Sequence, residues 1–446
     1  MGTFPDRSPG RFATIGLIVF PERRHDTRWQ PLLHDAEAKR VWSAIHDVAE
    51  ALRLEVEEVR PDSDPSLNDG TAGLALFFAH LGVATGEEVW SEYAQRLIEQ
   101  AVDALANQPL NAWLHGGFAG VGWTIKHLEG LLFDESDDDD PISELLSEML
   151  EHPVARGDFD LIKGLTGFGV YALEALPRPA ARHLIEQVIE RLADIGEPAG
   201  GGFSWFTPPE MLPTWQLEHA PDGYFNLGVA HGVPGVISLL AACAAAGVLP
   251  RERRPMLEGA VDWLLRQKQT GDVWSFPVWV AEGVTRSPTR PAWCYGDPGV
   301  AAALLTAARH TQSSAWEAEA LEIARRAVTR PMDESRVIEA CLCHGAAGLG
   351  HVFNRMHQAT GDPLLAQAAR RWFLHALDLR RPGEGVAGFL SYASEDPDEP
   401  KWAATTGFLV GASGVALALL AAVTPQEPAW DRALAISVPL ERLPSV

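Results

Sequence analysis

The tetrapeptide Gly232-Val233-Pro234-Gly235 opens an apolar run that continues from Val236 to Ala246. The same pattern, G-x-x-G ahead of an apolar run, occurs seven times in the chain at steps of 47 to 68 residues. A sequence motif repeated at such spacings indicates a repeat architecture, in which each unit packs against its neighbours. The first glycines of the seven copies are Gly70, Gly117, Gly164, Gly232, Gly296, Gly345 and Gly411.

Each repeat is expected to contribute a pair of helices. Runs such as Val300 to Ala308 are apolar on nearly all sides, which predicts buried inner helices. In the fourth repeat, Met256, Ala260, Trp263 and Leu264 form a single apolar stripe at helical spacing, which predicts an outer helix. Seven inner helices sheathed by seven outer helices in a closed ring would leave no end repeat exposed. We therefore predict an all-α fold, a double seven-helix barrel.

Three gaps between repeats are about 20 residues longer than the others and lie at 198–226, 270–292 and 382–406. They are rich in Gly, Pro, Trp and Phe, which predicts loops with short strands. All three end on the same side of the ring as the glycines. Long loops on one face of a scaffold usually build a binding site, although surface loops without a function remain the alternative.

The chain divides into three predicted parts. Residues 1–66 form an N-terminal extension with one outer helix, expected from Glu37 to Glu58. Residues 67–437 form the seven-repeat ring, and 438–446 form a loose C-terminal tail. The acidic run Asp134 to Asp140 is expected to be a solvated loop.

Composition excludes several classes of protein. The chain has 446 residues, 46% of them hydrophobic, and a net charge of −24, which argues against a nucleic-acid binder. The apolar stretch Ile15 to Phe20 is too short to cross a bilayer, and no secretory leader is recognised. Four cysteines do not make a disulfide framework. We expect a cytoplasmic protein, with peripheral membrane association in a biosynthetic complex left open.

Reactive residues stand directly before the glycines of two neighbouring repeats. Cys294 and Cys343 both lie two positions before a first glycine, and His344 follows Cys343. Two thiolates and one imidazole are a ligand set typical of zinc. Three protein ligands leave the fourth coordination position of the ion open, as in catalytic zinc sites. Buried apolar thiols are the alternative for the cysteines. We expect neither Cys243 nor Cys341 to be a ligand.

Four further residues are candidates for handling protons and charge. His231, in the fourth repeat, is placed to shuttle a proton, and Asp160 could orient its imidazole. Arg290 and Tyr295 flank the first metal cysteine and could stabilise a developing oxyanion. For each of the four, a structural hydrogen bond is the alternative. His115, in the second repeat, is a weaker candidate.

Three sequence motifs, in a chain with seven G-x-x-G helix pairs, resemble those of the lanthionine synthetase C-like family, the lantibiotic cyclases. They are Ala230-His231-Gly232, Trp293-Cys294-Tyr295-Gly296 and Cys343-His344-Gly345. The resemblance covers roughly residues 66 to 437. It implies an α/α toroid of fourteen helices and a zinc ion held by Cys294, Cys343 and His344. It also implies that His231, Asp160, Arg290 and Tyr295 handle protons.

The activity implied by this resemblance is an intramolecular Michael-type addition. A zinc-activated peptide cysteine attacks the β-carbon of a dehydroalanine or dehydrobutyrine in the same peptide, and a lanthionine or methyllanthionine thioether ring results. His231 is the expected proton donor, with water as the alternative. Tyr295, directly after the zinc cysteine, resembles the stand-alone bacterial cyclases.

The resemblance also implies partners. The expected substrate is a dehydrated precursor peptide with leader and core. A separate dehydratase and an export protein are expected alongside it. No nucleic acid is expected, and the protein is not expected to be an integral membrane protein.

Three other functions remain to be weighed. One is a thiol transferase that adds glutathione to dehydroamino acids. Another is a non-catalytic peptide-binding toroid with a structural zinc. The last is an α/α-barrel glycosidase, which would need two carboxylates flanking the scissile bond. The acidic residues expected at the rim are Asp160, Asp69 and Asp297.

Overall fold

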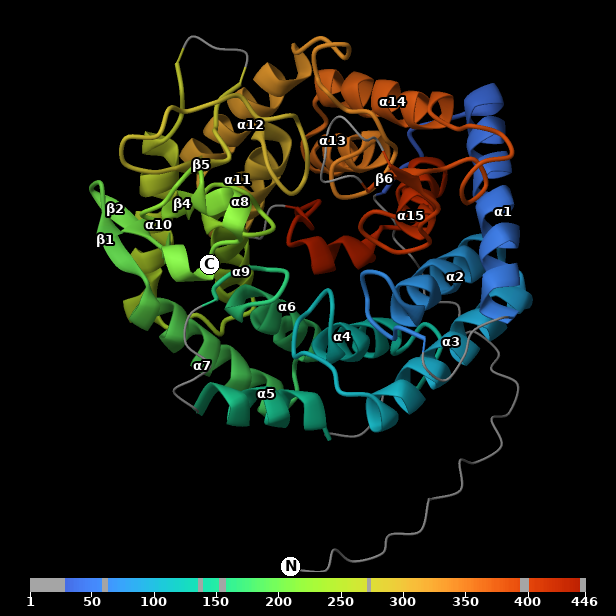
Figure 1. The fold of residues 1–446 in the computed structure, drawn as a ribbon, viewed down its shortest axis with the longest axis horizontal. Helices are drawn as coiled ribbons and strands as arrows, with labels where there is room; N and C mark the ends of the chain where they lie inside the picture. The colour runs from blue at the N-terminus through green and yellow to red at the C-terminus, as the bar shows by residue number, and fades with distance from the viewer. Residues whose placement is uncertain are drawn as a thin grey trace, which may run out of the picture.

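Seven helices form a closed inner ring in the computed structural model, which describes residues 29–57, 63–134, 139–151, 158–270, 274–393 and 401–441 (Figure 1). Each ring helix packs against its two ring neighbours, and the last packs against the first. Every one of them begins at the residue that follows the first glycine of a repeat. The ring helices are α2 (Thr71–Thr85), α4 (Phe118–Leu128), α6 (Leu165–Ala175), α9 (Val233–Ala245), α11 (Asp297–Thr311), α13 (Ala346–Thr360) and α15 (Ala412–Val423).

Seven outer helices sheathe this ring, so the predicted double seven-helix barrel is confirmed. In α10, the predicted stripe of Met256, Ala260, Trp263 and Leu264 is buried. Six outer helices follow their inner helix in the chain, with a short 3-10 turn, η3 (Arg251–Arg253), leading into α10. The outer helices are α3 (Glu88–Asn107), α5 (Pro141–Glu151), α7 (Pro179–Ile195), α10 (Arg254–Arg266), α12 (Ser314–Val328), α14 (Pro363–Asp378) and α1 (Asp35–Glu57).

The seventh outer helix is α1, which comes from the N-terminal part of the chain. No outer helix follows α15 within residues 424–441; α1 packs against α15 instead, between α14 and α3. Its buried face includes Val41, Ile45 and Val48. On its outer side, Arg40 makes a 2.8 Å ion pair with Asp378 of α14. The seventh repeat is therefore completed by a helix that is remote in sequence.

Backbone hydrogen bonds link the seven glycine loops into an uninterrupted circle at one end of the barrel. Each loop bonds to the next, and the seventh bonds to the first, so the side chains that precede the glycines meet at one rim. The donors and acceptors are Asn68 N to His115 O (2.7 Å), His115 N to Ile162 O (3.2 Å), Leu161 N to Ala230 O (3.0 Å), Ala230 N to Cys294 O (3.4 Å), Cys294 N to Cys343 O (3.3 Å), Cys343 N to Leu409 O (2.8 Å) and Phe408 N to Asn68 O (2.6 Å).

The second glycine of each motif lies against the backbone of its own loop. A Cβ at Gly348 would lie 1.8 Å from the carbonyl oxygen of Leu342, and a Cβ at Gly414 would lie 1.8 Å from that of Phe408. The same collision, with the carbonyl six residues earlier, occurs at the other five copies. Because no side chain fits there, the repeated glycine serves packing and needs no catalytic role.

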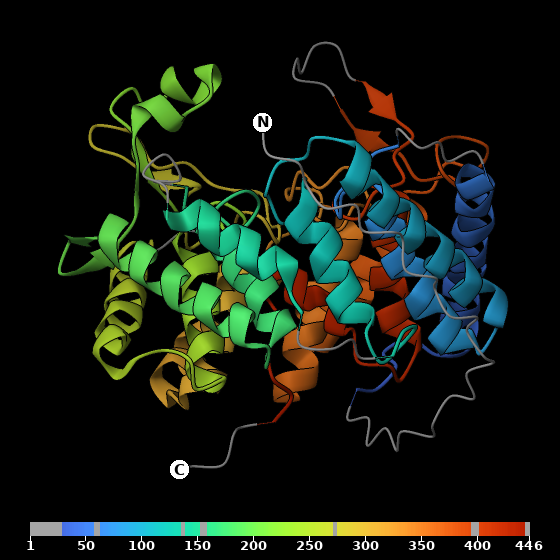
Figure 2. The same cartoon turned by 90° about the horizontal axis from the view of Figure 1, so that it is seen from below.

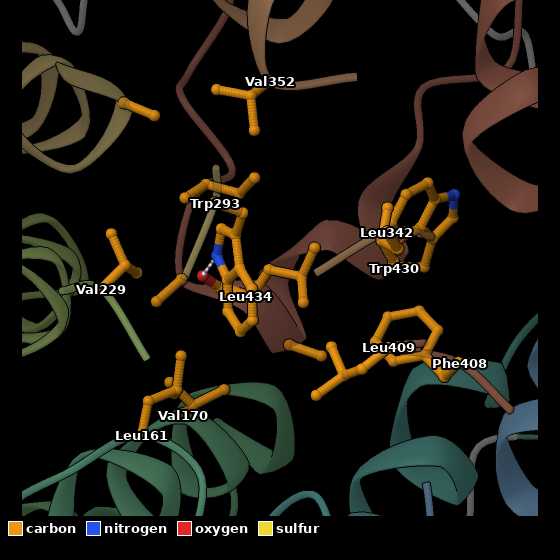
Figure 3. Close-up of a cluster of buried hydrophobic side chains, with 14 of the residues drawn as sticks. Leu161, Val170, Val229, Trp293, Leu342, Val352, Phe408, Leu409, Trp430 and Leu434 are labelled. Atoms are coloured by element: carbon orange, nitrogen blue, oxygen red, sulfur yellow. Dashed lines mark hydrogen bonds between the residues drawn. The ribbon is translucent and has the colours of Figure 1, made fainter. Parts of the chain in front are cut away.

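The centre of the ring is filled. A C-terminal segment (residues 424–438, called the plug from here on) enters it and contains the 3-10 helix η4 (Ala429–Leu434). The Trp293 indole Nε1 donates a 2.9 Å hydrogen bond to the carbonyl of Leu434, amid apolar side chains from several repeats (Figure 3). Val438, the first residue of the predicted tail, is also buried, whereas 442–446 lie outside the described residues. The barrel is therefore a packed core and not a pore.

The long gaps hold the short strands expected of them, together with a one-turn helix. Two different gaps join in one antiparallel sheet, in which β4 pairs with both β3 and β5. The one-turn helix α8 and the β6–β7 hairpin project from the same end of the molecule (Figure 2). The elements are β1 (Glu197–Ala199), β2 (Gly202–Ser204), β3 (Phe206–Thr207), η2 (Pro209–Met211), α8 (Thr214–Leu217), β4 (Tyr224–Asn226), β5 (Trp279–Val280), β6 (Ser391–Tyr392) and β7 (Trp402–Ala403).

Candidate metal and acid–base site

Ring closure brings the three predicted metal ligands together. Cys294 precedes α11 and Cys343 precedes α13, and their loops are joined by the hydrogen bond from Cys294 N to Cys343 O. The two sulfur atoms and a ring nitrogen of His344 all lie within 4.8 Å of one another. Residues 49 positions apart in sequence therefore present three donor atoms to one point.

A buried carboxylate holds the imidazole of this cluster. His344 Nε2 lies 3.0 Å from Glu339 Oε1, and the other oxygen of Glu339 accepts a 3.0 Å hydrogen bond from the backbone N–H of Tyr392 in β6. This leaves Nδ1 of His344 as the ring nitrogen available to an ion, and metal-ligating histidines commonly have such a carboxylate partner. Glu339 and His344 also form a second three-residue group with Cys341.

The electrostatics of the cluster suit a bound cation. The hydrogen bond from Cys343 lowers the pKa of Cys294 well below its ordinary value, and the positive charge of Arg290 acts in the same direction. Burial disfavours a charged His344, but the sulfurs of Cys341 and Cys294 and the Glu339 carboxylate outweigh it and raise its pKa to about 12. Soft thiolates with imidazole favour zinc over magnesium or calcium. The residues present therefore fit a zinc ion.

An acid–base pair lies beside this cluster on the rim. His231 Nδ1 lies 2.7 Å from Asp160 Oδ2, and the side chain of His231 is 39% exposed, whereas that of Asp160 is 5% exposed. The other oxygen of Asp160 accepts a 2.7 Å hydrogen bond from Lys163 N. Burial lowers the pKa of His231, but the bond to Asp160 outweighs this and raises it above its ordinary value. The pair can hold a proton at an atom that reaches solvent.

Tyr295 joins the pair to the cysteine cluster. Its ring stacks on that of His231, with centroids 6.0 Å apart and 26° between the planes. The phenol oxygen accepts a 3.3 Å hydrogen bond from Asn226 Nδ2. Burial raises the pKa of Tyr295, so the phenol stays protonated and can donate a hydrogen bond.

The structure brings Arg290 to the same site and places His115 beneath it. The charge of Arg290 acts on both thiols and on Glu339. His115 is 1% exposed, and its Nε2 lies 3.2 Å from the carbonyl oxygen of Ala433 in the plug. Burial lowers the pKa of His115 to about 4. His115 therefore lies against the plug, whereas the seven other candidates line the rim.

A cavity of about 560 Å³ opens beside His231, Asp160 and Tyr295. Its opposite wall comes from the sheet β3–β4–β5 and from the segment around α8. A volume of this size accommodates a small ligand or a few residues of a peptide.

A family model described as lanthionine synthetase C-like protein matches residues 61–435. The chain belongs to the lanthionine synthetase C-like family. The family that the sequence motifs suggested is thereby confirmed, and the predicted class of enzyme, a thioether-forming lanthionine synthetase, is confirmed at the level of the family.

Individual relatives agree with this assignment. The nisin biosynthesis protein NisC of Lactococcus lactis subsp. lactis is 24% identical to this lanthionine synthetase C-like protein in an alignment of 314 residues that covers 64% of this chain and 72% of the relative. A solved structure of a nisin cyclase superposes with a TM-score of 0.68 at 20% identity, covering 89% of this chain and 97% of the other. The structural likeness confirms the fold. Within the described residues of this chain, no helix is long and apolar enough to cross a membrane.

Sequence reasoning missed two residues of this lanthionine synthetase C-like protein, Glu339 and Asn226. Both lie six positions before the first glycine of their repeats, as Arg290 does. That position is polar in all seven repeats, a regularity that could have identified them. The residues at this position are Asp64, Asn111, Asp158, Asn226, Arg290, Glu339 and Thr405.

Proposed function

We propose that this lanthionine synthetase C-like protein is a zinc-dependent cyclase that closes thioether rings in a dehydrated precursor peptide. One observation carries the proposal. The Cys294, Cys343 and His344 cluster lies on the same rim as a partly exposed His231–Asp160 pair, and the two are joined through Tyr295. A nucleophile and a proton donor are thus available to one substrate.

The metal would be held by Cys294, Cys343 and His344, with Glu339 orienting the imidazole. A zinc ion held there would lower the pKa of a peptide thiol and supply a thiolate at neutral pH. The positive charge of Arg290 favours the anionic form of both cysteine sulfurs, against the effect of burial, and so prepares this end of the site for an anionic sulfur.

His231 would supply the proton at the other end. Asp160 accepts from Nδ1, which fixes the ring and leaves Nε2 to exchange a proton with the substrate. Tyr295, neutral and packed on His231, would donate to the enolate oxygen as negative charge develops there.

The reaction is an isomerisation. A C–S bond forms between the peptide cysteine and the β-carbon of the dehydroamino acid, and the C=C electron pair moves onto the carbonyl as an enolate. The thiol gives up one proton, and the α-carbon takes up one proton from His231 Nε2. The product therefore has the mass of the substrate and one free thiol fewer.

The activity is tested with a dehydrated, cysteine-bearing peptide followed by thiol alkylation and mass spectrometry. We expect the peptide mass to stay constant while one alkylation site is lost for each ring formed. A parallel reaction with a cysteine-free dehydrated peptide and free glutathione tests the transferase alternative. Addition of glutathione without ring closure would overturn the proposed function.

The ligand set is tested by metal analysis of purified variants. Cys294→Ala and Cys343→Ala are expected to lose both zinc and cyclisation. Cys341→Ala is the matched control, because Cys341 also lies beside His344 but is not in the proposed set. If Cys341→Ala lost the metal and Cys294→Ala kept it, the group of Glu339, Cys341 and His344 would be the metal site instead.

Other expectations stay predictions. They are the separate dehydratase, the export protein, the leader and core of the substrate, and a cytoplasmic or peripheral membrane location. The three-part division of the chain is likewise a prediction.

A further inference from the structure

The cavity beside His231 has two chemically different sides. The catalytic side is polar and presents Asp160, His231 and Tyr295. The other side comes from two separate gaps in the repeat and is mainly apolar, with three aromatic rings among its side chains; it includes Leu212, Trp215, Tyr224 and Trp279. The proton chemistry explains the polar side but not this aromatic wall, by which we mean Leu212, Trp215, Tyr224 and Trp279.

The aromatic wall is a folded unit with its own small core. Leu212, Ala220 and Tyr224 form a buried cluster that is separate from the main core, and Trp279 packs against it. The Tyr224 and Trp279 rings stack with centroids 5.2 Å apart and 9° between their planes. Tyr224 Oη donates a 2.7 Å hydrogen bond to Gln216 Oε1, which ties β4 to α8. The surface is thus preorganised rather than a loose loop.

Trp215 stands out on this surface because it is 57% exposed. It lies on α8 at the cavity, and its ring is 6.3 Å from that of Trp279. A large indole held in solvent beside a second indole gains free energy when a ligand covers it. The same cavity is lined by the His231–Asp160 pair, so a substrate bound to that pair is in reach of Trp215.

We infer that the aromatic wall is a subsite for a bulky apolar or aromatic side chain next to the dehydroamino acid of the substrate peptide. The inference rests on the proposed function. When the α-carbon of the dehydroamino acid is within reach of His231, the adjoining residue on one side is within reach of the cavity that the wall lines. Indole faces there would stack on an aromatic side chain or cover an aliphatic one.

The charges around the cavity disfavour an acidic neighbour. Two carboxylates, Asp158 and Asp160, line it, and the one lysine of the lining, Lys163, makes a 3.1 Å ion pair with Asp158. His231, the other basic residue of the lining, is paired with Asp160, so a substrate carboxylate would meet cations that already have carboxylate partners and would lose its hydration against an apolar wall. The subsite therefore selects by apolar contact and against negative charge.

Two sets of three peptides test the inference. Each peptide has one dehydroalanine and one cysteine. Within a set, the peptides differ only in the residue beside the dehydroalanine, which is Phe, Ala or Asp. One set places this residue before the dehydroalanine, and the other set places it after. We expect wild-type kcat/KM to favour Phe over Ala by about tenfold in one set, as burial of an aromatic side chain gives. Asp should be poorer than Ala.

Two variants and one control assign this preference to the wall. Trp215→Ala, at an exposed position, should reduce the Phe-to-Ala ratio to about two while the Ala peptide still cyclises. Trp279→Leu should also reduce it. Trp113→Ala is the control, because Trp113 is an exposed indole, 38% accessible, on the loop before α4 and outside the cavity lining. Its ratio should match wild type.

Binding separates this inference from the proposed function. Serine-for-cysteine versions of the peptides cannot cyclise, and their dissociation constants are measured by calorimetry. Tighter binding of the Phe peptide that Trp215→Ala abolishes supports the subsite even if cyclisation fails. Equal rates and equal binding of Phe and Ala peptides by wild type, or an undiminished preference in Trp215→Ala, would overturn it. Absence of cyclisation of all six peptides would overturn the proposed function alone.

Discussion

Two histidine–aspartate pairs in this protein have similar N···O distances and opposite environments. At the rim, His231 Nδ1 lies 2.7 Å from Asp160, and the imidazole is 39% exposed. In the core, His351 Nε2 lies 2.9 Å from Asp431 of the plug, and both side chains are fully buried. Geometry alone therefore does not tell a working pair from a structural one.

A neighbouring cation and access to solvent make the difference. Arg355, also fully buried, makes a 2.8 Å ion pair with Asp431 and so occupies the carboxylate. Burial lowers the pKa of His351, with the charge of Arg355 adding to it, whereas the bond to Asp160 raises the pKa of His231. At neutral pH the core pair is Asp431 with Arg355, and the rim pair can carry a transferable proton. The core arrangement fastens the plug to α13.

Removing the rim imidazole should have the largest effect. His231→Asn is expected to lower the cyclisation rate by roughly 10²- to 10⁴-fold, because a positioned general acid is lost. Zinc content and melting temperature should stay near wild type, since His231 is neither a proposed ligand nor buried. Rates are measured by the alkylation assay. Loss of metal from this variant would show that His231 is a ligand.

A substitution in the core pair should lower the stability of the protein rather than its activity. Asp431→Asn leaves the buried Arg355 without its main counter-charge, which costs about 3–5 kcal/mol of unfolding free energy. Denaturant unfolding measures the loss, and cyclisation per folded molecule should be unchanged. Arg40→Ala, which breaks an exposed ion pair of α1, is the control and should cost about 1 kcal/mol or less. A fully stable Asp431→Asn protein would contradict the fastening role.

A third carboxylate–imidazole pair, Glu339 with His344, is expected to act on metal affinity. Glu339→Gln keeps the size of the side chain but removes the charge that orients and polarises the imidazole. Zinc affinity should fall by roughly 10- to 100-fold. Competition with a chromophoric chelator measures it without any activity assay. Unchanged affinity would mean that Glu339 only anchors the hairpin at Tyr392.

The smallest expected effect is a shift of the pH profile. Asp160 raises the pKa of His231, so the acid form of the imidazole persists to higher pH and activity is lost as pH rises through that pKa. In Asp160→Asn the alkaline limb of kcat should move to lower pH by about one unit. Profiles of both enzymes over pH 5–9 measure the shift. If the alkaline limb did not move, the loss of activity at high pH would belong to the titration of another group.

The ring could be predicted from sequence because its rule is local. Each G-x-x-G begins one inner helix, and the apolar runs show which helices are buried. The seventh outer helix could not be paired in this way, because α1 follows no glycine phrase. Its place depends on a contact with α15 that only the closed ring creates.

The candidate site likewise contains residues that the repeat pattern predicts and residues that it does not. Cys294, Cys343 and His344 could be predicted because they share a register directly before the glycines, and ring closure follows from the repeat. Glu339 and Asn226 were missed because their register is further from the glycines and their residue types vary between repeats. The aromatic wall was beyond reach, since it joins two insertions whose pairing in one sheet no repeat dictates.

The position of α1 bears on when the protein becomes competent during biosynthesis. Among the helices of the double ring, α1 is translated first, yet two of its neighbours, α14 and α15, are translated last. Until they emerge from the ribosome, the apolar face of α1 has no permanent cover, and the circle of loop hydrogen bonds stays open between Phe408 and Asn68. A nascent chain thus cannot close its rim until the last two helices have been translated, and any reaction that needs the closed rim must wait for them.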